Sequence, residues 1–266
     1  MSAPRIVFLM YHELELVGRK LCQSDPGYVR YILPLETFRL QMASIKESGR
    51  RGLNVGEALR YPPEHHASEP GVCITFDDGC ETDLIAAAPV LRELGFNATF
   101  YVTAGFVGTP GYLNAGQLRD LDAHGFQIGC HSMTHAYLSD LPEPELKREV
   151  VDAKLLIEGI VGHPIEHFSC PGGRYDQRTL RMARHAGFRS VANSEFHANS
   201  PAASRYELGR VAMLRDLQIE EFSSICRGRG LWKKRLLNEA RRSAQRVLGN
   251  RAYDSLRARL LGEPQQ

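Results

Sequence analysis

Short apolar runs alternate with amphipathic stretches along most of the chain, and this alternation predicts strands separated by helices. Four amphipathic stretches end at a glycine, and a β-prone run begins directly after each one. A glycine just past a helix adopts the left-handed conformation that ends it, so these positions predict helix ends. The glycines are Gly49, Gly95, Gly125 and Gly187. The runs predicted as strands are Ile6–Tyr11, Gly52–Val55, Val72–Phe76, Ala98–Val102, Phe126–Gly129, His167–Cys170 and Phe188–Val191.

The segments between these runs have the spacing of helices. Residues 36–48 carry apolar side chains on one helical face. Asp140 and Pro142 predict the start of a long helix through Ile160, because a cap is followed by a proline in the first turn. Pro89 predicts the start of an earlier helix, or a kink in it. Repeated alternation favours an α/β fold in which crossover helices join parallel strands, as a barrel or a doubly wound sheet. No Gly-x-Gly-x-x-Gly or Walker-type loop follows a predicted strand, so a nucleotide site has no support.

Composition and charge narrow the function classes. The chain has 266 residues, 43% of them hydrophobic and 24% charged, and its net charge is +2. This small net charge disfavours a nucleic-acid partner. No apolar run reaches the roughly 18 residues that a membrane-spanning helix needs.

The charge is uneven, and this predicts two parts. Residues 226–266 hold 11 Lys and Arg against 3 Asp and Glu, a net of +8. We therefore predict a body over residues 1–225 and a basic amphipathic helical tail over 226–266, with an apolar stripe between Leu231 and Leu248. The tail either packs on the acidic body or makes peripheral contact with an anionic membrane surface.

The six cysteines show neither a Cys-x-x-Cys pair nor the spacing of a disulfide framework. The apolar run Ile6–Tyr11 is too short for the core of a signal peptide. We therefore expect free thiols and a cytoplasmic protein, placed at the inner membrane face if the tail binds membrane.

Three segments at predicted strand ends carry candidate chemistry. Asp77 and Asp78 are adjacent carboxylates, which repel each other unless a cation or a shared proton relieves the repulsion. His131 and His135 have the spacing of metal ligands. A third segment, Pro171-Gly172-Gly173, lets the backbone approach a ligand closely. Each segment alone is also compatible with an ordinary turn.

Together these segments predict a hydrolytic metal site. Asp78, His131 and His135 supply one oxygen and two nitrogens, and two histidines with a carboxylate leave a fourth position open. Zinc is the default metal for these ligands, although nickel, cobalt and iron suit them too. Asp77, beside the metal ligand, is the candidate general base.

The sequence resembles the polysaccharide deacetylases of the NodB-homology type, the fourth carbohydrate esterase family. The matching stretches are ITFDDG, GFNATFYVT, GFQIGCHSMTH and FSCPGGRYD, in that order, and the resemblance covers roughly Ile6 to Met213. It implies a distorted (β/α) barrel of parallel strands and metal-dependent hydrolysis of an N-acylated sugar. Asp77 then matches the family's base, Asp78 and the two histidines match its metal ligands, and the Gly172 N–H would stabilise an oxyanion.

The sequence departs from the family pattern at two places. Family members commonly have an arginine where Ser169 stands here, and the late Leu-x-His motif that supplies the catalytic acid is missing. The segment LMYHEL ends the first predicted strand. It is similar to the start of the circularly permuted poly-N-acetylglucosamine deacetylases, in which the acid histidine comes first. His12 is then the candidate acid. Arg210 is the candidate replacement for the missing arginine.

The sequence thus predicts a metal-dependent hydrolase that removes an N-acyl group, most simply acetyl, from an amino sugar. A cytoplasmic enzyme would meet that sugar in a nucleotide- or lipid-linked precursor. Two alternatives stay open at this point. One is an amidohydrolase acting on an N-formyl sugar or a cyclic ureide, and the other is an inactive carbohydrate-binding relative.

Overall fold

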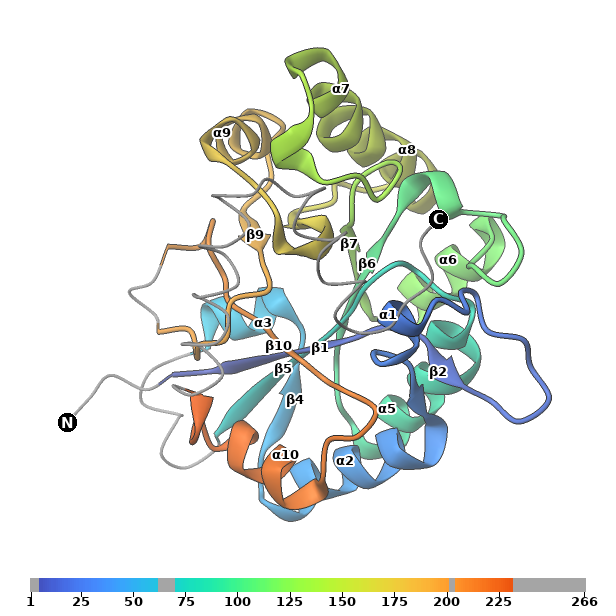
Figure 1. The fold of residues 1–266 in the computed structure, drawn as a ribbon, viewed down its shortest axis with the longest axis vertical. Coiled ribbons are helices and arrows are strands. Elements are labelled where there is room, and N and C mark those ends of the chain that lie inside the picture. The colour runs from blue at the N-terminus through green and yellow to red at the C-terminus, as the bar shows by residue number, and fades with distance from the viewer. Residues whose placement is uncertain (1–4, 62–69, 201–203, 232–266) are drawn as a thin grey trace.

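A computed structural model describes residues 5–61, 70–200 and 204–231 of the protein (Figure 1). Its strands lie centrally and most of its helices lie around them. The strands are β1 (Val7–Tyr11), β2 (Leu14–Glu15), β3 (Leu33–Pro34), β4 (Arg51–Leu53), β5 (Gly71–Phe76), β6 (Thr99–Val102), β7 (Gln127–Cys130), β8 (His167–Ser169), β9 (Ser190–Ala192) and β10 (Val211–Ala212). All seven predicted strands are present.

The main sheet is parallel and curled. Its order is β10-β1-β5-β6-β7-β8-β9, and β4 pairs with β5. The two ends of this order are joined through residues 208–212. Leu208 forms a parallel bridge to Ala192 of β9, while Val211 lies in register with Leu9 of β1. The predicted distorted barrel is therefore confirmed, and its closing segment is the one that carries Arg210.

Alternation along the strands divides the apolar side chains into two cores, because successive side chains point to opposite faces. Val7, Leu9 and Tyr11 belong to the larger core, whereas Ile6 and Phe8 belong to the smaller one. The larger core includes residues of the surrounding helices, so it lies on the outer face of the sheet. The smaller core contains Tyr101, whose ring lies 5.3 Å from the Arg210 guanidinium.

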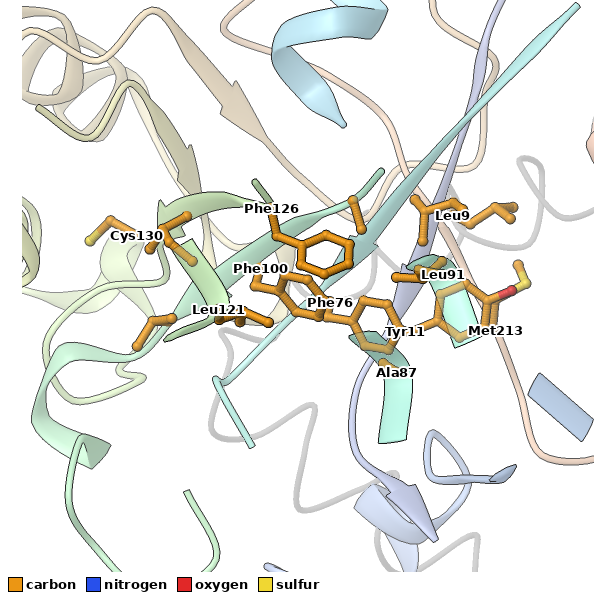
Figure 2. Close-up of a cluster of buried hydrophobic side chains, with 14 of the residues drawn as sticks. Leu9, Tyr11, Phe76, Ala87, Leu91, Phe100, Leu121, Phe126, Cys130 and Met213 are labelled. Carbon is orange, nitrogen blue, oxygen red and sulfur yellow. The ribbon is translucent and has the colours of Figure 1, made fainter. Parts of the chain in front are cut away.

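A row of aromatic rings in the outer core fixes the strand ends that carry the site (Figure 2). Tyr11, Phe76 and Phe100 are neighbours on β1, β5 and β6, with ring centroids 5.2 and 4.9 Å apart along the row. Phe126 closes the row with an edge contact at 5.4 Å. Because Phe76 points outward, the next residue, Asp77, points to the inner face.

The helices follow the predicted segments with one correction. The predicted long helix does not start at Asp140, which lies in a short 3₁₀ turn, but at Glu143 after Pro142, and no side chain caps it. A π-helical stretch interrupts it at Arg148–Asp152. The α-helices are α1 (Pro26–Val29), α2 (Leu35–Glu47), α3 (Val55–Arg60), α5 (Ala88–Leu94), α6 (Ala115–Ala123), α7 (Glu143–Lys147), α8 (Ala153–Val161), α9 (Gln177–His185) and α10 (Ile219–Cys226). Two stretches are π-helical, η1 (Asp83–Ala87) and η4 (Arg148–Asp152). Three are 3₁₀ turns, η2 (Ala104–Phe106), η3 (Leu138–Asp140) and η5 (Pro171–Gly173).

The four predicted helix-ending glycines all have positive φ, between 68° and 85°. Most of the predicted tail, residues 232–266, lies outside the described residues. Among the helices that are described, none has the length and apolar character to span a bilayer.

Candidate metal and catalytic site

The two adjacent aspartates stand at the carboxyl end of β5. The Asp77 N–H donates to the Tyr11 carbonyl at 2.9 Å, so Asp77 still extends the parallel pairing. Asp78 turns the chain away with φ of 78°, in the left-handed region that a non-glycine residue rarely adopts. The two residues are 2% and 1% exposed. Such strain persists where the surrounding structure holds it in place, and it is concentrated at functional sites.

The two histidines stand on the loop after β7. The His131 N–H donates to the Val102 carbonyl at 2.8 Å, and its ring Nδ1 lies 2.9 Å from the Ser169 carbonyl. A carbonyl only accepts, so Nδ1 carries the proton and Nε2 presents a lone pair. His135 has φ of 63°, and its N–H donates to Ser132 Oγ at 3.1 Å.

The loop and the strand end bring three ligand atoms together. Asp78 Oδ1 lies 3.6 Å from His131 Nε2 and 3.4 Å from His135 Nε2. These separations are long for hydrogen bonds. They match the roughly 3.3–3.4 Å between ligand atoms on a tetrahedral zinc with bonds of about 2.0–2.1 Å. Asp78 Oδ1 is buried and accepts no hydrogen bond from the described residues.

The protonation states also suit a cation. Burial raises the pKa of Asp78, but His135 and the other nearby histidines outweigh it and leave that pKa below its usual range. Burial lowers the pKa of His131 to about 4, so its imidazole is neutral at pH 7. An ionised carboxylate with no donor on one oxygen, facing a neutral imidazole, is a metal-ligand set. Asp78, His131 and His135 therefore fit a divalent metal, as the sequence predicts.

Two further residues support this set, and local sequence patterns do not reveal them. The Tyr28 hydroxyl, on α1, donates to Asp78 Oδ2 at 2.7 Å. Glu149, on the π-helical stretch, accepts from the N–H groups of Met133 and Thr134 at 2.9 and 2.8 Å, and from the Thr134 hydroxyl at 2.6 Å. Glu149 thus anchors the loop between the two histidines. It is only 4% exposed, although a glutamate in an amphipathic helix predicts a solvated side chain.

Asp77 faces a fully buried arginine. Arg210 donates from Nη1 to Asp77 Oδ1 and from Nη2 to Asp77 Oδ2, both at 2.7 Å. Burial raises the pKa of Asp77, but the Arg210 guanidinium outweighs it and holds that pKa well below its usual range. Asp77 Oδ2 also lies 3.7 Å from His131 Nε2, so this ionised carboxylate adjoins the ligand set.

Ser169 explains how Arg210 reaches this place. Arg210 Nη2 donates to Ser169 Oγ at 2.7 Å, and Nε donates to the Asn193 carbonyl at 3.1 Å. The position where relatives commonly carry an arginine therefore holds a small hydroxyl that contacts an arginine from another strand. The guanidinium that pairs with Asp77 comes instead from Arg210, the residue directly before β10.

His12 and Gly172 stand at the same edge of the sheet. His12 follows β1 directly, and its ring lies 6.0 Å from that of Tyr28 and 5.2 Å from that of Tyr31. Burial lowers the pKa of His12, and the nearby Asp78 and Asp77 oppose this. Gly172 lies on η5 after β8 with φ of 60°, and a Cβ there would stand 3.0 Å from the Tyr137 ring. The structure therefore brings all seven predicted residues to one edge.

The chain is similar to the polysaccharide deacetylases of the NodB-homology type, which are hydrolases. The family model described as "Polysaccharide deacetylase" matches residues 64–191. This match contains both aspartates and both histidines. It begins after His12 and ends before Arg210, so it covers neither of those two residues.

Two sequence relatives illustrate the similarity. YxkH of Bacillus subtilis (strain 168), which carries a polysaccharide deacetylase name, is 29% identical over 208 residues, covering 78% of this chain and 71% of YxkH. The peptidoglycan-N-acetylglucosamine deacetylase of Bacillus cereus is 31% identical over 125 residues, covering 47% of this chain and 56% of that protein.

Solved structures share the fold. The Streptococcus pyogenes deacetylase PplD in complex with acetate has a TM-score of 0.70 at 22% identity, and the match covers 83% of this chain and 97% of PplD. IcaB from Ammonifex degensii has a TM-score of 0.69 at 23% identity, covering 84% and 97%.

Proposed function

We propose that the protein is a metal-dependent deacetylase that hydrolyses the N-acetyl group of an amino sugar, in a polysaccharide or its lipid- or nucleotide-linked precursor. The observation that carries this proposal is the ligand set beside an ionised spare carboxylate. Asp78 Oδ1 faces the Nε2 atoms of His131 and His135, and Asp77 lies beside them in its ion pair with Arg210.

Asp78, His131 and His135 would hold the cation, with zinc as the default and nickel, cobalt or iron as alternatives. When bound, a divalent cation supplies Lewis-acid polarisation of a carbonyl and lowers the pKa of water. Asp77 has a low pKa and is therefore a weak base, so it can deprotonate water readily only when the pKa of that water is lowered too. Asp77 takes the proton of the attacking water, and Arg210 keeps Asp77 charged and oriented toward it.

His12 supplies the second proton transfer. It directly follows β1, the strand that pairs with β5. We assign His12 as the acid that protonates the departing sugar amine. The Gly172 N–H is assigned to the oxyanion that develops on the carbonyl oxygen, since backbone N–H groups preorganised at a turn stabilise such charge. The family and the names of the relatives support acetyl as the acyl group and an amino sugar as its carrier.

The test is acetate release by the purified protein from N-acetylglucosamine oligosaccharides, before and after chelation and after readdition of Zn²⁺. We expect chelation to abolish release and Zn²⁺ to restore it. Asp77→Asn should lower kcat by about 10²–10⁴-fold, the range that a general base contributes, with metal content unchanged. The matched control is Asp152→Asn, which alters an exposed carboxylate on the surface.

A substrate panel separates the alternatives. Parallel assays with an N-formyl sugar, a cyclic ureide and a lipid-linked N-acetylated sugar identify the acyl group and the carrier. Release of formate but not acetate would reassign the substrate. Binding of the oligosaccharide by a metal-loaded protein with no release from any compound would contradict a catalytic role.

A further inference from the structure

Two cysteines that the proposed function does not use lie together beside the metal-ligand turn. Cys80 follows Asp78 by two residues and is fully buried, and Cys22 lies half-buried on the segment between β2 and α1. Their sulfur atoms and a carboxylate oxygen of Glu13 all lie within 4.8 Å of one another. In the described part of the chain, the other cysteines belong to no such group. Residues 58 positions apart in the sequence are therefore held within reach of a covalent bond.

A hydrogen-bond network holds Cys22 in this place. The Cys22 N–H donates to both oxygens of Glu13, at 3.1 and 2.9 Å, and the thiol donates to the Gly111 carbonyl at 3.1 Å. Arg19 donates to Glu13 Oε1 at 2.9 Å and to the same Gly111 carbonyl at 3.0 Å. The Cys22 sulfur and the guanidinium thus contact one oxygen.

The same contacts disfavour a second metal ion in this group. Glu13 accepts three hydrogen bonds and pairs with the Arg19 guanidinium, so its charge is already balanced. A divalent cation at the two sulfurs would stand beside that guanidinium and would have to displace it. A disulfide bond between the two cysteines would leave the Arg19–Glu13 ion pair in place.

We propose that Cys22 and Cys80 form a dithiol–disulfide couple. The oxidant is a low-molecular-weight disulfide such as oxidised glutathione. The half-buried Cys22 thiolate attacks one sulfur of the oxidant, forms a mixed disulfide and releases one glutathione thiolate. The Cys80 sulfur then attacks the Cys22 sulfur and its proton passes to the glutathione thiolate released in the first step. The intramolecular bond forms as the second glutathione leaves. Two electrons pass from the protein sulfurs to the oxidant.

The bond would join two segments that both reach the metal-ligand turn. Cys80 lies on the chain immediately after Asp78 and Gly79, and Cys22 precedes α1, whose Tyr28 donates to Asp78. Oxidation therefore acts directly on the backbone and the hydrogen bond that place Asp78. This inference goes beyond the proposed function, and its test uses no sugar substrate.

The experiment is thiol counting in glutathione redox buffers. The full chain is equilibrated without oxygen at increasing ratios of oxidised to reduced glutathione, denatured in N-ethylmaleimide and weighed by intact mass spectrometry. Fully reduced protein should carry six adducts, one for each cysteine. Oxidised protein should carry two fewer, and digestion should yield a peptide that links Cys22 to Cys80. Cys226→Ala, which alters a cysteine elsewhere, should show the same loss of two adducts.

Cys22→Ala should abolish the loss, and its half-buried position makes folding secure. The proposal is overturned if the loss persists in this variant, if the linked peptide joins another pair, or if Cys22 stops at the mixed disulfide with Cys80 still alkylated. Zinc content provides a further check. If Cys22→Ala lowers the zinc bound per chain by one ion, the group is a metal site and the thiol couple is wrong.

Discussion

Replacing Arg210 with methionine tests the buried ion pair at the centre of the site. Arg210 is fully buried, and its guanidinium is paired with both oxygens of Asp77. Methionine keeps an apolar stem of similar length and leaves Asp77 buried without a counter-charge. Breaking one side of a buried pair costs about 3–5 kcal/mol of folding free energy, because the remaining charge is uncompensated. Domains of this kind have stabilities of roughly 5–15 kcal/mol, so we expect the variant to fold with reduced stability.

The pH dependence identifies Asp77 as the group responsible. In the wild type the pKa of Asp77 is lowered, so the pair contributes stability above the ordinary aspartate pKa and loses it as pH falls through the lowered value. In Arg210→Met the guanidinium no longer opposes burial, so the pKa of Asp77 rises from its wild-type position, although His131 and His12 still lower it. The variant is then most destabilised at pH 7 and recovers as its Asp77 protonates. Each unit of difference between the two pKa values changes the free energy by about 1.4 kcal/mol.

The assay is urea unfolding followed by far-ultraviolet circular dichroism, at pH 7 and pH 4. We expect the loss of stability to be larger at pH 7 than at pH 4. Arg189→Met is the matched control, since Arg189 is 64% exposed in its ion pair with Glu166, and it should change stability by less than about 0.5 kcal/mol. A loss below about 1 kcal/mol at pH 7, equal at both pH values, would refute the buried pair. The acidic limb of kcat/KM should also move to higher pH in Arg210→Met, which a purely structural role would not produce.

Three further predictions concern the same site. In Ser169→Arg/Arg210→Ser, a guanidinium supplied from β8 should restore at least a tenth of wild-type kcat, whereas Arg210→Ser alone should stay well below that level. No recovery in the double variant would contradict the idea that a guanidinium from either position can pair with Asp77. Glu149→Gln should weaken Zn²⁺ binding about 10–100-fold in a competitive chelator titration, because it weakens the anchor of the histidine loop, with the exposed Glu143→Gln as control. Because burial lowers the pKa of His12, the protonated acid becomes scarcer as pH rises, so wild-type kcat/KM should fall on the alkaline side. His12→Asn should be slower and flat there, and an unchanged alkaline limb would contradict the acid assignment.

Local patterns predict the strands of the main sheet well because each strand is a run of several apolar residues that ends at the same edge. The short strand β10 escapes prediction, since two residues give no period to detect. Its place follows from pairing with Leu9 and Met10 of β1, which lie about 200 residues earlier in the chain. The start of the long helix was wrongly predicted at Asp140 because Pro142 and Pro144 both fit a first turn, and only tertiary packing decides between them.

The metal ligands are visible in the sequence because they occur as adjacent or closely spaced pairs. The residues that support them are not, because each is an isolated residue on another element. Tyr28 lies on a one-turn helix and Glu149 lies in a helix whose polar face predicts solvent exposure. Cys80 and its neighbour Cys22 are 58 residues apart in the sequence, so no spacing rule associates them. In each case the missing information is a contact between segments that are distant in the sequence, and local patterns do not reveal such contacts.

The arrangement of the curled sheet explains why residues at the two ends of the family match can complete one site. His12 and Arg210 lie on neighbouring elements, because β1 pairs with β10 on one side and with β5 on the other. In a ring of parallel strands every carboxyl end faces the same rim, so a catalytic group can come from the first strand or the last without changing its place in space. The order of motifs along the chain is then free to vary, provided that each side chain still reaches the same rim.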